Sequence, residues 1–179
     1  YLDGVVRKAP DKNLTDTFNT NLIFSLFYST GMTIDTEEFV SVTSRSPRYY
    51  VSAAYWDRDS LLWSLPAIAI ADGKKARNLI TYAFTTQMKN VGIHSRYIDG
   101  TVLDPGFELD ELCAPVIALD KYISLTGDSS ILNKSFIMEG LERISGMIKE
   151  KKGECGLYET FLQPTDDFAP KKYLTYDNI

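Results

Sequence analysis

Residues 59–71 constrain the fold more than any other part of this chain. A helix over this segment would have no polar side, because apolar residues cover its whole circumference: Leu61, Leu62, Trp63, Leu65, Ala67, Ile68, Ala69 and Ile70. A helix that is apolar all round is buried on all sides. The run is interrupted by Pro66 and is shorter than the roughly 18 residues of a membrane span. The segment therefore predicts a buried helix inside a globular core.

Further helices follow from the spacing of the apolar residues. A first helix is predicted from residue 14 to near residue 31, and a second apolar helix over residues 109–125. Helices with one apolar stripe are predicted over residues 74–91 and 129–151. The residues expected to cap or stop these helices are Asn13, Gly31, Gly92, Gly127, Asp128 and Ser129. Apolar and amphipathic helices thus alternate along the chain.

This alternation predicts an all-α fold in which apolar helices form an inner layer and amphipathic helices an outer layer of a multi-helix toroid. Residues 32–50 are expected to form an extended, ordered connection, and residues 153–179 lack a helical period. An α-solenoid is the alternative. A solenoid would show self-similarity at a fixed period, which this sequence does not show.

Composition excludes several classes of function. Among the 179 residues, Lys and Arg number 19 against 24 Asp and Glu, for a net charge of -5. That balance is unfavourable for gripping a phosphate backbone, so we expect no nucleic-acid partner, and without a membrane-length apolar run we expect no membrane partner. The chain starts at Tyr1 without an initiator Met, which suggests that it begins inside a longer protein.

Cysteine and histidine are scarce. Cys113 and Cys155 lie far apart in the sequence, which favours a reducing, cytoplasmic environment. His94 is the sole histidine, so a metal site built from several histidines is excluded and we expect no metal or cofactor. His94 itself is expected in a loop or at the rim of a substrate site rather than as a catalytic base.

The first cluster of candidate functional residues precedes the apolar helix of residues 59–71. It contains Tyr55, Trp56, Asp57, Arg58 and Asp59. Asp57 or Asp59 could cap the helix while Arg58 pairs with either carboxylate. A sugar ring, however, needs an aromatic face for its C–H surface and charged groups for its hydroxyls, and Trp56 with Arg58 and Asp59 supplies both.

Two more acidic clusters are present. Residues 104–111 include Phe107, Asp110 and Glu111 at the start of the second apolar helix, where the helix dipole alone would also favour carboxylates. In residues 163–170 the neighbouring carboxylates Asp166 and Asp167 could have one pKa raised by burial and mutual repulsion, as a general acid requires. The alternative for that loop is a solvated turn.

The order of these motifs resembles the (α/α)6-barrel glycosidases, and most closely the glucosidase domain of glycogen debranching enzymes and their bacterial relatives. The resemblance rests on residues 55–62, residues 97–100, Asp110 and residues 125–128, and it extends more weakly to residue 179. It implies a partial (α/α)6 toroid of helical hairpins whose long loops carry the active site. Residues 1–179 would then be a single fragment of a six-hairpin catalytic domain, incomplete at both ends.

The resemblance also implies roles for individual residues. Arg58 and Asp59 would hold the terminal sugar in the innermost subsite, and Asp167 would be the general acid, with Asp166 as the alternative. The general base of an inverting mechanism would lie beyond Ile179. The full predicted substrate-binding set is Tyr55, Trp56, Arg58, Asp59, Phe107, Asp110 and Glu111.

The expected substrate is an α-linked oligosaccharide or glucan, and the expected macromolecular partner is the remainder of the barrel or a second copy of the chain. Two other functions stay open at this point. A non-catalytic carbohydrate-binding or assembly module would keep the cleft but lack the base. A helical scaffold would use the acidic clusters as helix caps and would need a partner to cover its apolar helices.

Overall fold

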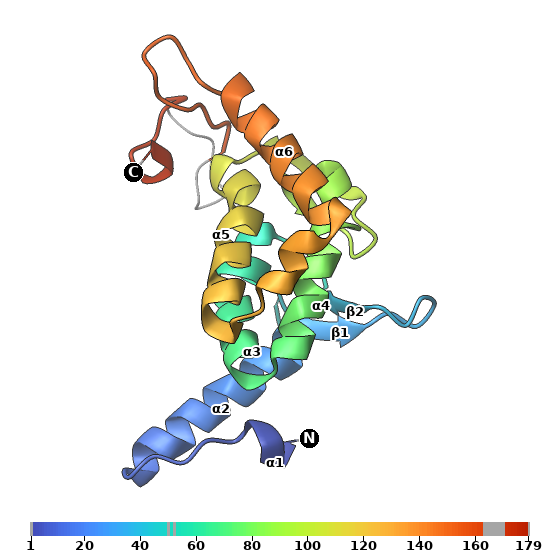
Figure 1. The fold of residues 1–179 in the computed structure, drawn as a ribbon, viewed down its shortest axis with the longest axis vertical. Coiled ribbons are helices and arrows are strands. Elements are labelled where there is room, and N and C mark those ends of the chain that lie inside the picture. Colours follow the sequence, from blue (N-terminus) through green and yellow to red (C-terminus); the bar gives the residue numbers. More distant parts are fainter. Residues whose placement is uncertain (1, 50, 52, 163–170, 179) are drawn as a thin grey trace.

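The computed structural model describes residues 2–49, 51, 53–162 and 171–178, and this part of the chain is mostly helical (Figure 1). The helices and strands are α1 (Leu2–Val5), α2 (Lys12–Ser29), β1 (Thr30–Met32), β2 (Phe39–Ser41), α3 (Leu65–Ala71), α4 (Gly73–Phe84), β3 (Ile93–Arg96), β4 (Val102–Phe107), α5 (Leu109–Thr126) and α6 (Ser135–Glu150). A π-helical segment, η1 (Arg58–Ser64), leads directly into α3. Short 3-10 turns are η2 (Met88–Asn90), η3 (Ser129–Asn133) and η4 (Tyr176–Asn178).

Local chemistry explains where several helices begin and end. The Asp72 carboxylate caps α4 by accepting the backbone N–H groups of Lys74 and Lys75, and Gly127 stops α5 with a left-handed φ of 73°. The predicted stop at Gly127 is therefore confirmed. The predicted cap at Asn13 is wrong, because Asp11 has the extended backbone of an N-cap and its carboxylate accepts the N–H of Leu14.

The described residues form two small antiparallel sheets, so the prediction of an all-α fold holds for the helices but not for the connections. β1 pairs with β2, with Thr30 opposite Ser41, and β3 pairs with β4, with Ile93 opposite Phe107. The two strands of the first sheet have three residues each. Strands this short carry too few alternating positions to be recognised from sequence.

The helices predicted to be apolar lie side by side. α3 packs against both α4 and α5, and α6 packs against α4 and α5 (Figure 1). Their shared core consists mainly of aliphatic side chains, among them Leu61, Leu65, Ile68, Leu79, Ile80, Leu112, Leu119, Ile137 and Ile144. Gly140 allows the close approach of α6 to α4, because a Cβ built there would lie 2.6 Å from the Phe84 ring.

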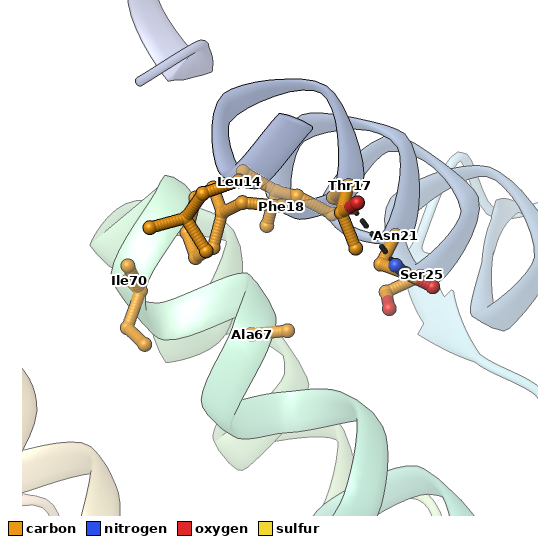
Figure 2. A pocket seen from close by; sticks show the side chains of 8 residues that line it. Leu14, Thr17, Phe18, Asn21, Ser25, Ala67 and Ile70 are labelled. Atoms are coloured by element: carbon orange, nitrogen blue, oxygen red, sulfur yellow. Dashed lines mark hydrogen bonds between the residues drawn. The ribbon is translucent and has the colours of Figure 1, made fainter. Parts of the chain in front are cut away.

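Complete burial of residues 59–71 is not observed. Leu61 and Ile68 are inaccessible, but Trp63 is 64% exposed and Ile70 is 48% exposed. These two side chains lie on a part of the helix that the described elements leave open. α2 covers the helix only loosely at Ile70, leaving an apolar pocket of about 330 Å³ that Leu14, Phe18, Ala67 and Ile70 help to line (Figure 2). That pocket has no charged side chain in its lining, so it is a poor candidate for polar chemistry.

Candidate active site

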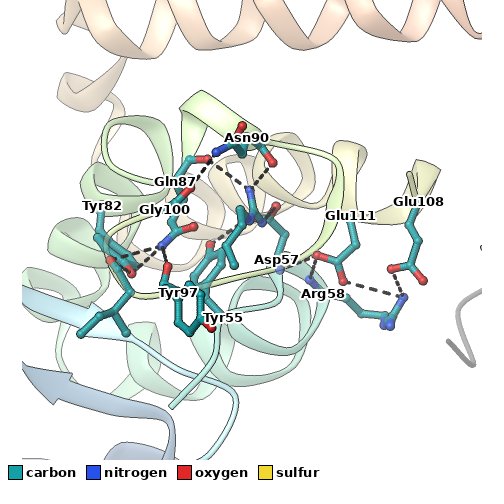
Figure 3. A network of polar contacts seen from close by, with 12 residues as sticks. Tyr55, Asp57, Arg58, Tyr82, Gln87, Asn90, Tyr97, Gly100, Glu108 and Glu111 are labelled. Carbon is teal, nitrogen blue, oxygen red and sulfur yellow. Dashed lines mark hydrogen bonds and ion pairs between the residues drawn. The ribbon is translucent and has the colours of Figure 1, made fainter. Parts of the chain in front are cut away.

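A buried guanidinium joins the first two acidic clusters. Arg58 starts η1, and its Nη1 lies 2.7 Å from Asp110 Oδ2. The same Nη1 lies 3.4 Å from Glu108 Oε2 and 3.8 Å from Glu111 Oε1 (Figure 3). Arg58 is 3% exposed, and the carboxylates come from the residue before α5 and from its first turn. The structure thus brings together three of the predicted binding residues and adds Glu108.

The backbone N–H groups at the start of η1 donate hydrogen bonds to a side chain of α5, which is distant in the sequence. Glu111 Oε2 accepts the backbone N–H of Asp57 and, at 3.3 Å, that of Arg58. Asp57 makes no capping hydrogen bond with its own side chain, so the alternative in which it caps the following helix is wrong. Its carboxylate is engaged elsewhere in the structure, which leaves the capping of η1 to Glu111.

The Asp57 carboxylate forms a buried ion pair with Arg96 of β3. Asp57 Oδ1 also accepts the Tyr55 hydroxyl at 2.8 Å, and Arg96 Nη1 donates to the carbonyls of Gln87 at 3.1 Å and Asn90 at 3.0 Å (Figure 3). Tyr55, Asp57 and Arg96 are fully buried. The network therefore fixes the loop before η1 against the β3–β4 hairpin, where Tyr55 and Arg96 also exchange backbone hydrogen bonds.

Burial and charge shift the pKa values of this cluster. Burial works to lower the pKa of Arg58, but the carboxylates of Glu111, Asp110 and Glu108 outweigh it and raise the pKa. Burial raises the pKa of Glu111 well above its ordinary value, and the neighbouring Asp57 carboxylate adds to the rise. Four carboxyl groups thus surround two guanidinium groups. The excess of carboxyl groups disfavours anionic ligands and favours ligand groups that donate hydrogen bonds.

An aromatic side chain borders the cluster. Trp56 is 7% exposed, and its ring meets the His94 ring edge-on with the centroids 5.4 Å apart. His94 Nδ1 lies 3.3 Å from Glu108 Oε1. The predicted loop placement of His94 is wrong, because the structure places it on β3. There it contacts the two site residues Trp56 and Glu108.

Asp110 also lines a pocket of about 250 Å³ next to the cluster. The other lining residues are Leu62, Leu109, Cys113, Ile117, Tyr176 and Asp177. Burial raises the pKa of Asp177 to about 6, with smaller increases from Asp110 and Glu108. Asp177 was not among the predicted site residues. An acid next to an aromatic residue, as in Trp56–Asp57, is the sequence signal that could have indicated it.

The predicted catalytic residues Asp166 and Asp167 lie outside the described residues. The chain on either side of residues 163–170 is anchored close to Glu108, because the backbone N–H groups of Phe161 and Leu162 donate to the Phe107 carbonyl at 3.1 Å. The Thr160 N–H also donates to the carbonyl of Lys172. Both described ends of that loop therefore lie at the end of β4, where α5 begins.

The remaining predicted residues lie at the margin of the cluster. Asp59 is half-buried in the first turn of η1. Phe107 is half-buried at the end of β4, with Lys151 Nζ 4.1 Å from its ring centroid.

Within the described ranges, no group of three or more His, Cys, Asp and Glu side chains could hold a metal ion. No described helix is both long enough and apolar enough to span a membrane.

Comparison with known proteins shows which solved structure this chain resembles. No protein-family model matches the chain, and no curated protein sequence does. Among solved structures, the chain is similar to a metal-independent α-mannosidase of Streptococcus pneumoniae, determined as a non-productive complex with α-1,6-mannobiose. The TM-score is 0.74 at 18% sequence identity. The described part of this chain therefore has a helical fold similar to that of about half of this mannosidase.

The similarity covers 98% of this chain and 51% of the mannosidase chain, so this chain spans about half the length of that protein. It supports the expected helical glycosidase fold, but it does not show the expected partial toroid. It does not support a relationship to glycogen debranching enzymes in particular, because the matched enzyme is a mannosidase and the sequence identity is low.

Proposed function

We propose that this protein takes part in the hydrolysis of an α-glycosidic bond at the non-reducing end of a neutral oligosaccharide or glucan. The observation that carries the proposal is the buried Arg58 between three carboxylates, beside Trp56, in a glycosidase fold. An apolar surface next to fixed charged groups is the combination that binds the C–H face and the hydroxyls of a sugar.

The buried positions suggest a division of roles among the residues. Arg58 and Asp110 are the groups that would contact sugar hydroxyls, since Asp110 also lines the adjoining pocket. Tyr55 and Glu111 are inaccessible, and they would act by holding Asp57 and the start of η1 in place. They are therefore positioning residues in this proposal.

The chemical step would use a carboxylic acid from the loop of residues 163–170. Asp167, or Asp166 in its place, would give its proton to the glycosidic oxygen as the bond to C1 breaks. A second carboxylate would take a proton from the water whose oxygen bonds to C1 on the opposite face. The product would have inverted configuration.

The sequence resemblance favours a glucosyl residue as the terminal sugar, and the matched solved structure is of an enzyme that acts on mannosides. These two possibilities give a direct test. We expect the protein to release glucose from isomaltose or maltotriose faster than it releases mannose from α-1,6-mannobiose. The reverse preference would keep the glycosidase proposal and overturn the glucosidase assignment.

The catalytic assignment is tested with Asp167→Asn. Turnover should fall by about 10²–10⁴-fold, because general acid catalysis contributes about that much. The matched control is Asp120→Asn on the exposed side of α5, which should keep full turnover. Thermal unfolding followed by circular dichroism should be the same for both variants. Full turnover in Asp167→Asn and Asp166→Asn would refute the assignment, and binding of isomaltose without any released sugar would favour a non-catalytic module.

A further inference from the structure

The pocket beside the Arg58 cluster contains a second carboxyl group that the proposed chemistry does not use. Asp177 in η4 and Asp110 in α5 both line this pocket. Both carboxylate oxygens of Asp177 are buried, and neither accepts a hydrogen bond from the described part of the chain. A buried acceptor without a donor is costly, so a group that donates hydrogen bonds would be stabilised there.

The segment that carries Asp177 is fixed by its neighbour. The Asn178 side chain accepts the backbone N–H of Tyr158 at 2.6 Å and donates to the carbonyls of Tyr158 at 3.0 Å and Leu174 at 2.9 Å. The two bonds to Tyr158 hold η4 against the chain around that residue, and the bond to Leu174 closes the turn of η4 itself. The position of Asp177 opposite α5 therefore follows from tertiary contacts.

The charges around the pocket select the class of ligand. Asp177 is influenced by Asp110 and Glu108, which raise its pKa, and by Arg58, which lowers it. Arg58 already contacts Asp110, Glu108 and Glu111. An anion would be repelled by the excess of carboxylates, whereas the hydroxyls of a neutral sugar can donate to them.

We propose that Asp177 and Asp110 together accept hydrogen bonds from two hydroxyl groups of one neutral pyranose ring, and that this pair makes the pocket select neutral sugars over uronic acids. The inference rests on the proposed function and names the class of sugar at the same site. Leu62, Ile117 and the Tyr176 side chain supply apolar surface for the C–H groups of the ring. A pocket of about 250 Å³ suits one sugar ring rather than a drug-sized ligand.

Cys113 provides a reporter, because it lines the same pocket. Its only companion thiol, Cys155, is exposed and can be removed as Cys155→Ser. In that background, methyl α-D-glucopyranoside or methyl α-D-mannopyranoside should slow the reaction of Cys113 with N-ethylmaleimide. Glucuronic acid at the same concentration should give no protection. Burial raises the pKa of the Cys113 thiol to about 11, so labelling is followed at pH 8.5 with long reaction times.

The role of Asp177 is tested by calorimetry with the same methyl glycosides. Asp177→Asn should weaken binding by about tenfold or more, since a hydrogen bond to a charged group contributes about 1.5–3 kcal/mol. The ionised form of Asp177 is the form that accepts the hydroxyl as a charged group, and the groups that face it are Asp110, Glu108, Arg58 and Cys113. Wild-type affinity should therefore fall about tenfold from pH 8 to pH 5, where about a tenth of Asp177 is ionised.

The Asp177→Asn variant should lose that pH dependence, and Asp120→Asn should keep it. Equal protection of Cys113 by glucuronic acid and the methyl glycosides would overturn the proposal without any variant. So would unchanged affinity in Asp177→Asn. If the protein releases sugar while Cys113 is not protected, this inference fails and the proposed function stands. If the methyl glycosides protect Cys113 but the protein releases no sugar, the proposed sugar binding in this pocket is supported and the proposed hydrolase function is wrong.

Discussion

The ion pair between Arg96 and Asp57 offers a sharp test of how the site is held. Arg96 is fully buried, pairs with Asp57 and donates to the carbonyls of Gln87 and Asn90. Replacing it in Arg96→Met fills much of the same volume but leaves a buried carboxylate without its cation. Breaking a buried pair in this way costs about 3–5 kcal/mol. The two carbonyls left without donors place the expected loss at the upper end of that range.

The loss should also depend on pH. Burial raises the pKa of Asp57, and Arg96 opposes the rise, so removing Arg96 raises the pKa further. An acid whose pKa is higher in the folded protein than in the unfolded chain destabilises the fold progressively as pH rises through that interval. Arg96→Met should therefore be less destabilising at pH 5 than at pH 8.

Urea unfolding followed by circular dichroism and by tryptophan fluorescence measures these effects. Arg77→Met is the matched control, because Arg77 pairs with Asp128 near the surface and its removal should cost much less. In the double variant Asp57→Asn/Arg96→Met the buried charge is gone, and about 0.5–3 kcal/mol should be recovered. An Arg96→Met loss no greater than that of Arg77→Met, or a loss that grows toward pH 5, would refute the argument.

Two further predictions concern packing and a single titrating group. Gly140→Ala should destabilise the protein by about 1–3 kcal/mol, because the new Cβ would overlap the Phe84 ring. Gly146→Ala is the control: its Cβ would meet open space, so the substitution should stabilise α6 by about 0.5–1 kcal/mol. Equal urea midpoints for the two variants would contradict this prediction. Burial raises the pKa of Asp177 to about 6, so its ionisation opposes folding as pH rises from about 4 to 6. Asp177→Asn should therefore raise the unfolding temperature at pH 8 but not below pH 4. Asp120→Asn should leave the unfolding temperature unchanged at both pH values. An equal increase for Asp177→Asn at both pH values would show that charge is not the cause.

Several elements could be predicted because their cause is local. The apolar residues around the circumference of residues 59–71 indicated a core helix, and Leu61, Leu65 and Ile68 are buried as expected. Gly127 adopts the left-handed conformation that ends α5, as its position after an apolar helix indicated. The exposure of Trp63 could not be predicted, because periodicity identifies apolar faces but not the elements that cover them.

The candidate site was predicted in its parts but not in its connections. Trp56, Arg58, Asp110 and Glu111 were recognised from residue type and from their places before apolar helices. Asp57 was seen there only as a possible helix cap, and the partner Arg96 left no signal, since nothing near it in the sequence suggests a buried pair 39 positions away. Glu108 lies within the acidic cluster of residues 104–111 and Asp177 lies outside the predicted clusters, and the sequence could not show that either carboxyl group is buried.

The amino-acid sequence by itself determined the order of the helices, their apolar faces, several of their ends and the chemistry available before each apolar helix. These features depend on neighbours within a few residues, where backbone geometry is set by local sterics and hydrogen bonds. The tertiary structure decided that Glu111 caps η1, 54 positions earlier in the chain, and that Arg96 neutralises Asp57. Those pairings depend on how β3, η1 and α5 pack together, and burial in that packing shifts the pKa values that the proposed chemistry would use.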